Sequence, residues 1–279
     1  MQEPVIRKLS STFVEKVWGV ESLPPPFPPQ PAGKRIGEVW FDPPAEFDTL
    51  LVKHIFASER LSVQAHPDDT QARSMNVGRN GKSECWVILD SEPGATIAAG
   101  FRNKITPSEM REAALDGSIV DQLVWHEVRS GDAFFIPAGT VHAIGGGVSL
   151  IEVQQNSDIT FRLFDYGRPR ELHLEQAMKV ADTGPYPSKF RSQMDCESGV
   201  LVDGPHFRLT YCRIAASGPQ PSLEDGPALL IPFSGQISID GQTLALGECA
   251  LASNLGQQRM EGDCLLLIAQ PPPPCDLAT

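Results

Sequence analysis

The sequence predicts a mainly β protein in which a small helical insert interrupts the strands. Short apolar runs alternate with Gly, Pro and Asp breaks from residue 36 to 89, a pattern typical of antiparallel strands in a sandwich or barrel. A helical pattern replaces them near residues 105–125, and a second set of strand-like runs follows a linker at residues 184–187. With 279 residues, 41% of them hydrophobic, the chain can bury a full core in one large or two medium domains.

The first strand-like runs lie at residues 37–41, 50–55, 61–66 and 85–89. Ahead of them, a proline-rich run at residues 24–31 cannot form a helix or an interior strand, because proline lacks an amide donor and fixes φ. We expect an irregular surface arm, used either as a rigid connector or as a ligand for an aromatic groove of a partner.

The helical insert has start and stop signals. Thr106-Pro107-Ser108-Glu109 resembles an N-cap followed by proline at the first helical position, and Gly117 ends the helix. Later elements in this half are expected as a helical piece at 119–123, strands at 132–136 and 147–162, and a short helix at 172–180.

Beyond the linker, strand-like runs are expected at residues 207–214, 228–233, 235–242, 249–252 and 264–268. The only histidine of this half is His206. With so few candidate metal ligands, we expect this half to be structural or oligomeric rather than catalytic.

Charge and cysteine content exclude several classes of protein. A formal net charge of -12 argues against binding to a nucleic-acid backbone. The N-terminus has no apolar signal core and no apolar run is long enough to span a bilayer, so we expect a cytoplasmic protein without a membrane partner. The absence of a CxxC pair favours reduced, mostly buried thiols. The cysteines are Cys85, Cys196, Cys212, Cys249, Cys264 and Cys275.

Four polar residues form a candidate metal site. Gln64 and His66 lie two residues apart in a strand-like run, so both point to one face. Glu84 and His142, on later segments, can complete the set. Two neutral imidazoles, an amide oxygen and a carboxylate leave a divalent cation with about one net positive charge, so it stays electrophilic. These donors suit Zn²⁺, although Mn²⁺, Co²⁺ or Fe²⁺ could bind them.

The spacing Gly131-x5-Pro137-x-Gly139-x2-His142 resembles the second signature of the cupin superfamily. Gln64-x-His66 with Glu84 resembles the first, with an amide where histidine is usual. Together with residues 61–69 (LSVQAHPDD) and 152–162 (EVQQNSDITFR), these motifs resemble the short bacterial form of the type I phosphomannose isomerases (mannose-6-phosphate isomerases). The resemblance runs from about Trp18 to Val180.

The resemblance implies two cupin-type (jelly-roll) β-barrel domains. Residues 1–185 would form the catalytic domain, with the helical insert, and residues 186–279 a cupin-like domain without metal ligands. The implied enzyme is a metal-dependent aldose-ketose isomerase that interconverts mannose 6-phosphate and fructose 6-phosphate through an enediol(ate), with one Zn²⁺ per chain. The partner is then a small sugar phosphate, and a homodimer is left open.

The family's site residues carry over to matching positions of this chain. The implied metal ligands are Gln64, His66, Glu84 and His142, and the implied catalytic arginine is Arg162. The family's pocket positions match Trp18, Glu38, Lys53, Ser62, Lys82, Glu152 and Asp158. Of these, Lys82, Glu152 and Asp158 are assigned to catalysis and the others to substrate binding.

Isomerisation moves a proton between C1 and C2, so it needs a base near both carbons and cations that hold the developing oxygen charge. Arg162 stays protonated and acts as a fixed stabiliser. Even separations would place Glu152, Asp158 and Arg162 on one face of a regular strand. We expect Glu152 to be the base, with Asp158 orienting Arg162 or replacing Glu152. Lys53, Lys82 and Arg162 are candidates for binding the phosphate.

Two alternatives remain open. An Fe-dependent cupin oxygenase would share the scaffold, although Gln64 in place of histidine argues against it. A non-catalytic sugar-phosphate-binding cupin would use the proline-rich arm and the second β set as interaction surfaces.

Overall fold

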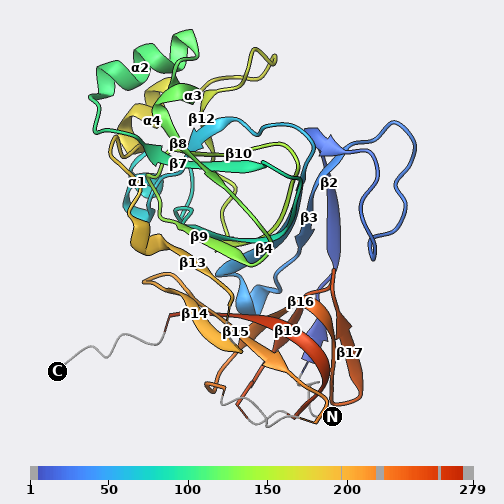
Figure 1. Ribbon diagram of the computed structural model, residues 1–279. Coiled ribbons are helices and arrows are strands. Elements are labelled where there is room, and N and C mark those ends of the chain that lie inside the picture. The colour runs from blue at the N-terminus through green and yellow to red at the C-terminus, as the bar shows by residue number, and fades with distance from the viewer. Residues whose placement is uncertain (1–5, 196, 218–222, 257–258, 273–279) are drawn as a thin grey trace, which may run out of the picture.

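The computed structural model of the chain describes residues 6–195, 197–217, 223–256 and 259–272. Three antiparallel sheets contain far more residues than the helices, which are few and short, and this confirms the predicted mainly β class with a helical insert. Figure 1 shows two sheets facing each other in the upper half of the molecule, with the third below them.

Two sheets build the half that contains the predicted site. The larger one has, in spatial order, β13 (Arg191–Gln193), β9 (Asp132–Ile136), β6 (Glu84–Ser91), β11 (Val148–Gln155), β4 (Leu50–Ala57), β3 (Ile36–Phe41) and β2 (Ser11–Val20). The smaller one has β12 (Phe161–Phe164), β5 (Val63–Ala65), β10 (His142–Ile144), β7 (Thr96–Phe101) and β8 (Leu123–Glu127). Trp86 and Phe134 of the larger sheet pack with Ile97 and Ile144 of the smaller in a buried core, so the two sheets form a sandwich.

The helices α2 (Pro107–Asp116), α3 (Ile119–Gln122) and α4 (Leu174–Val180) lie together at one end of this sandwich (Figure 1). The start of α2 is as predicted: the Thr106 hydroxyl accepts from the amide of Glu109, whose carboxylate accepts from the amide of Thr106. Gly117 ends the helix with φ 87°, a left-handed conformation that favours glycine. Met110 and Ala113 pack with Phe161 and Leu163 of the smaller sheet, which fixes the insert on the sandwich.

One helix and several strand boundaries differ from the sequence expectation. Helix α1 (Asp69–Ser74) was not predicted, although Asp68 and Gln71 form a capping box at its start. The expected strand at 147–162 is two strands in different sheets, β11 and β12, because the turn-forming residues Asn156, Ser157 and Asp158 interrupt it.

Six strands of the second half and one N-terminal strand form one sheet of seven strands. Its order is β1 (Ile6–Lys8), β18 (Ala250–Ala252), β16 (Ala228–Ile239), β19 (Met260–Gln270), β15 (Arg208–Ile214) and β14 (Ser198–Asp203), with β17 (Gln242–Ala245) paired to β16. Strand β16 unites the two runs expected at 228–233 and 235–242, with a register shift between Pro232 and Ser234. Val52 and Val153 of the first half pack with Leu229 and Leu267 in one buried core, so the two halves share an interior.

The proline-rich arm is irregular, as predicted, but it is anchored by apolar residues. Leu23 is buried, and the ring of Phe27 lies 5.3 Å from the rings of both His54 and Phe56. The 3-10 segments Ala45–Phe47 and Ser188–Phe190 complete the elements of the described chain.

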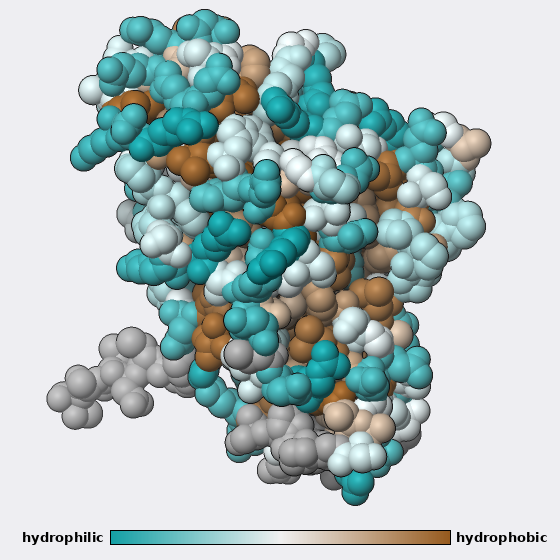
Figure 2. All heavy atoms as spheres, in the orientation of Figure 1, coloured by the Kyte–Doolittle hydropathy of each residue, from teal (hydrophilic) through white to brown (hydrophobic). Residues whose placement is uncertain are grey.

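Hydrophilic residues cover much of the face drawn in Figure 2, with hydrophobic ones in scattered patches. In the described part of the chain, no helix is long and apolar enough to cross a membrane. Cys85, Cys212, Cys249 and Cys264 are buried free thiols, as expected. Cys196 and Cys275 lie outside the described residues.

Candidate metal centre and its cavity

A cavity of about 250 Å³ lies beside the two sheets of the first half and gathers the predicted site residues. Every residue assigned to catalysis or substrate binding lines it. These are Trp18, Glu38, Lys53, Ser62, Lys82, Glu152, Asp158 and Arg162. The cavity is also lined by Lys16, Ile55, Leu61, Gln64, Trp86, Ile144, Thr160 and Arg170.

The four predicted metal ligands come from neighbouring strands. Gln64 on β5 is paired in register with His142 on β10, and His66 follows β5. Glu84, the first residue of β6, reaches them from the opposite sheet: its Oε2 lies 3.5 Å from Nε2 of His66 and its Oε1 lies 3.5 Å from Nε2 of His142. The ligand atoms of these three buried residues all lie within 4.8 Å of one another.

Backbone carbonyls fix the tautomer of both histidines. Nδ1 of His66 lies 2.7 Å from the carbonyl of Ile159, and Nδ1 of His142 lies 2.9 Å from that of Thr140. A carbonyl only accepts, so each Nδ1 carries the proton and each Nε2 presents a lone pair to the group. Burial lowers the pKa of His142 to about 4 and, helped by the charge of Lys82, that of His66 well below its ordinary value. Both rings are therefore neutral, as metal ligands must be.

The amide of Gln64 completes the group when its oxygen faces the two rings. One amide atom lies 3.3 Å from Nε2 of His142, and the other lies 3.1 Å from the hydroxyl of Ser62. Amide oxygen and nitrogen are assigned from their hydrogen-bond partners. With the oxygen turned toward a metal, the amide nitrogen donates to Oγ of Ser62, so this hydroxyl fits both orientations.

Glu84 supplies the negative charge of the group. Neither of its carboxylate oxygens, both buried, accepts a hydrogen bond of good geometry from the described residues, although Nζ of Lys82 lies 2.9 Å from Oε2. Burial and the neighbouring charge of Glu152 raise the pKa of Glu84 to about 7, against the lowering effect of Lys82. Orphaned carboxylate oxygens beside two imidazole lone pairs fit a divalent cation with nitrogen and oxygen ligands.

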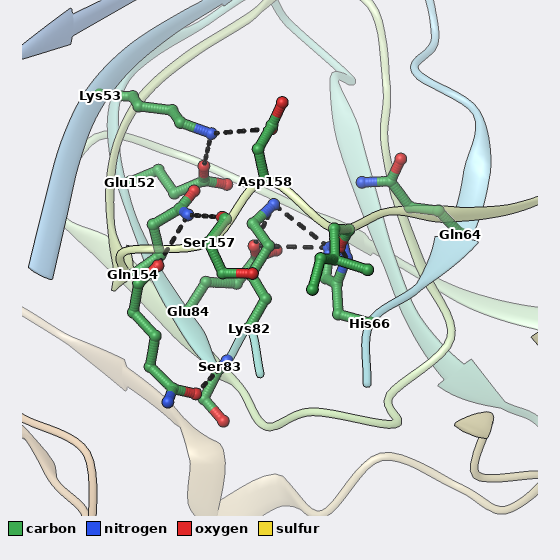
Figure 3. Close-up of polar contacts among 12 residues, drawn as sticks. Lys53, Gln64, His66, Lys82, Ser83, Glu84, Glu152, Gln154, Ser157 and Asp158 are labelled. Carbon is green, nitrogen blue, oxygen red and sulfur yellow. Dashed lines mark hydrogen bonds and ion pairs between the residues drawn. The ribbon is translucent and has the colours of Figure 1, made fainter. Parts of the chain in front are cut away.

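A second cluster lies beside the ligands, as Figure 3 shows. Nζ of Lys53 lies 3.3 Å from Glu152 and 3.9 Å from Asp158, and the indole of Trp86 donates to Glu152 at 3.0 Å. Burial would raise the pKa of Glu152, but Lys82, Lys53 and the Trp86 hydrogen bond outweigh it and lower the pKa to about 2. Glu152 is thus ionised at any working pH. The ammonium of Lys53 also lies 4.4 Å from the ring centre of Trp40.

Arg162 lies beside the metal ligands because its backbone pairs in register with Gln64. Its Nη1 donates to the carbonyl of Glu171 at 2.7 Å, and its buried Nε has no hydrogen-bond partner among the described residues. Asp158 pairs with Lys53 rather than with Arg162, so the expected single strand face does not link them. The cavity is still lined by all three residues: Glu152 from β11, Asp158 from the following loop and Arg162 from β12.

Two charged lining residues were not predicted. Lys16 lies 3.2 Å from Glu38, and Arg170 forms a two-pronged ion pair with Asp165. Lys16 is on a strand, β2, whose alternation was not recognised. Arg170 follows the last matching motif, and only its spacing from Arg162 could have drawn attention to it.

Comparisons with known proteins agree on one group. The chain is 33% identical over 262 residues to the probable mannose-6-phosphate isomerase GmuF of Bacillus subtilis, covering 86% of this chain and 82% of that protein. It is 26% identical over 317 residues to the putative mannose-6-phosphate isomerase YvyI of the same organism, covering 96% and 99%. No family model matches the chain.

Solved structures agree on the fold. A mannose 6-phosphate isomerase from Bacillus subtilis superposes with a TM-score of 0.80 at 24% identity, covering 94% of this chain and 98% of that one. A mannose 6-phosphate isomerase solved with zinc and yttrium gives 0.71 at 14% identity, covering 97% and 100%. These likenesses show that the chain shares the mainly β fold of the mannose 6-phosphate isomerases, with sheets that, over the described residues, are not closed into barrels.

Proposed function

The chain belongs to the mannose-6-phosphate isomerase family, and we propose that it interconverts mannose 6-phosphate and fructose 6-phosphate in the cavity lined by Glu152 and Arg162. The observation that carries this proposal is one arrangement: the buried group of His66, Glu84 and His142 lies next to Gln64, which lines the cavity together with Glu152 and Arg162. A base, a cation site and a fixed positive charge are what an aldose-ketose isomerisation needs.

Gln64, His66, Glu84 and His142 would hold one Zn²⁺, a choice supported by their nitrogen and oxygen donors and by the zinc in one structural relative. When bound, the cation would supply a Lewis acid that stabilises negative charge on the sugar oxygens at C1 and C2. A catalytic metal would need an open position for substrate or water, and Gln64, which lines the cavity, is the proposed ligand through which the group would adjoin it.

In our scheme Glu152 takes the proton from C2 of the open-chain aldose and returns it to C1, while the proton of the C2 hydroxyl passes to the oxygen at C1. Its carboxylate is ionised and lines the cavity, and Lys53 and Trp86 hold it in place. Arg162 stabilises the negative charge of the enediolate, because its guanidinium remains protonated throughout. Asp158 is the alternative base, since it lines the same cavity and is paired with Lys53.

The direct test is to load the purified chain with Zn²⁺ and follow fructose 6-phosphate formed from mannose 6-phosphate. We expect turnover at one metal per chain, and no conversion at that stoichiometry would overturn the proposal. Arg162→Ala should keep the metal and lose turnover by about 10²-fold or more, as loss of one electrostatic stabiliser does. A binding protein without catalysis would show no turnover in the unaltered chain, and Arg162→Ala would then reduce only the affinity for the sugar phosphate.

A further inference from the structure

The cations that line the cavity fall into two groups according to their partners. Each lysine lies against a buried carboxylate: Lys16 against Glu38 and Lys53 against Glu152, which both line the cavity, and Lys82 against Glu84 of the candidate metal centre. Their charges therefore balance the acidic cluster. The two arginines, Arg162 and Arg170, are the remaining cations of the cavity lining.

Neither arginine forms an ion pair with a carboxylate that lines the cavity. Arg162 donates to a backbone carbonyl, and its buried Nε has no partner among the described residues. Arg170 donates through Nε and Nη2, both at 2.6 Å, to the two oxygens of Asp165, so this pair does not use Nη1. Asp165 is only 2% exposed and is not among the residues that line the cavity. It therefore holds Arg170 from the buried side rather than from the cavity.

The segment that carries Arg170 is built to hold one conformation. The amide of Arg168 donates to the carbonyl of Asp165 at 3.0 Å, and Tyr166 adopts φ 54°, unusual for a bulky residue. The guanidinium of Arg168 also bridges two carboxylates: its Nη1 lies 3.3 Å from Asp165 and its Nη2 lies 3.0 Å from Glu59. The turn thus holds the guanidinium of Arg170 in one orientation at the cavity, as a preorganised binding group requires.

Arg162 and Arg170 both line the cavity, so two like charges face the same space. Two guanidinium groups at one cavity are stabilised by an anion placed between them, and a phosphate matches their donors.

We propose that Arg170, positioned by Asp165, binds the phosphate of the substrate and selects sugar phosphates over free sugars. This inference rests on the proposed isomerase function. The candidates from the sequence were Lys53, Lys82 and Arg162, and Arg170 was not among them. Lys53 and Lys82 lie against the buried carboxylates of Glu152 and Glu84. Arg170 is thus a specificity-determining residue, and Asp165 is a positioning residue.

The test compares phosphorylated and free sugar in Arg170→Gln. We expect KM for mannose 6-phosphate, and the inhibition constant of inorganic phosphate, to rise about 10- to 100-fold, as loss of a charge-assisted hydrogen bond implies. The preference for mannose 6-phosphate over mannose, measured as the ratio of the two kcat/KM values, should fall by a similar factor, and the bound metal should change less than about twofold. Asp165→Asn should give a smaller rise in the same two constants. The amide has the shape of the carboxylate but not its charge, so it holds the guanidinium of Arg170 less firmly.

Arg79→Gln is the charge-matched control. Arg79 is 86% exposed, lines a neighbouring depression and does not line this cavity. It should leave both constants unchanged, so an equal effect of Arg79→Gln would indicate general charge attraction and overturn the proposal. Unchanged phosphate inhibition in Arg170→Gln would overturn it as well. Calorimetry with inorganic phosphate on the zinc-loaded chain gives the same comparison if no isomerisation occurs, so failure of the function and failure of this assignment are distinguishable.

Discussion

Lys82 and Glu84 form a buried ion pair inside the candidate metal centre, with Nζ 2.9 Å from Oε2. The same ammonium lies 3.3 Å from Nε2 of His66. It therefore approaches two of the atoms that we propose as metal ligands. Burial disfavours its charge, but Glu84 and Glu152 outweigh burial and raise the pKa of Lys82, so it remains a cation.

This relationship predicts that Lys82 opposes metal binding. Two positive charges in a dry site repel each other, and the ammonium competes for Glu84. Lys82→Met should tighten Zn²⁺ binding by about tenfold or more, while turnover falls, since Lys82 also faces the substrate. A competition titration with a chelating indicator measures the affinity. Lys16→Met is the control: it also removes a lysine of this cavity, but one that pairs with Glu38 and not with a proposed metal ligand. It should leave the zinc affinity nearly unchanged. Weaker zinc binding by Lys82→Met would contradict this prediction.

Ser62 is predicted to orient the Gln64 amide toward the metal. Its hydroxyl lies 3.1 Å from that amide and would accept from the amide nitrogen when the oxygen is a ligand. Ser62→Ala should weaken zinc binding by about tenfold, the usual effect of losing an outer hydrogen bond to a ligand. Metal affinity, rather than activity, is the measurement.

The control for Ser62 is Ser91→Ala. Ser91 donates to the carbonyl of Val128 and does not line the cavity, so its replacement removes a hydroxyl without touching a ligand. If both variants bind zinc as the unaltered chain does, Ser62 has no role in orienting Gln64.

The two candidate bases can be separated by their amide variants. If Glu152 moves the proton, Glu152→Gln should lower kcat by about 10²- to 10⁴-fold, while Asp158→Asn, whose side chain is 64% exposed, should lower it much less. The exchange of sugar protons with deuterated water, followed by NMR, should fall in parallel with kcat. Equal metal content in both variants serves as the control. The reverse order of effects would assign the base to Asp158.

The sequence could predict the site better than the strand boundaries around it. Short motifs specify the type and the spacing of the four proposed ligands, Gln64, His66, Glu84 and His142. The fold then brings these residues together from three strands and an adjoining loop. The role of Asp158 depended on a regular strand to Arg162, and the turn at residues 156–158 broke that strand.

Other features depended on contacts far apart in the sequence. Strand β1 pairs with β18, and the core between the two halves joins Val52 to Leu267, so neither follows from local patterns. The pairing of Arg170 with Asp165 is local, yet its position at the cavity is set by the pairing of β12 with β5. Local propensity cannot reveal such tertiary neighbours.

His54 predicts how the stability of the chain depends on pH. It is fully buried against the rings of Phe27, Phe41 and Phe56, and neither ring nitrogen has a hydrogen-bond partner among the described residues. Burial lowers its pKa to about 3. The unfolded chain therefore takes up a proton at His54 below about pH 6.5, whereas the folded chain does so only near pH 3.

Between these two values the unfolded state binds more protons, so stability must fall as pH decreases through this window. Each unit of pKa difference contributes about 1.4 kcal/mol, and His54 alone should cost a few kcal/mol by pH 4. His54→Phe keeps an aromatic ring in this cluster but cannot be protonated. Urea unfolding at pH 7 and pH 4.5 should show a smaller loss of stability for His54→Phe than for the unaltered chain. His126→Phe is the comparison, because His126 is only partly buried. An equal loss in the unaltered chain and His54→Phe would mean that His54 can be protonated in the folded state without cost.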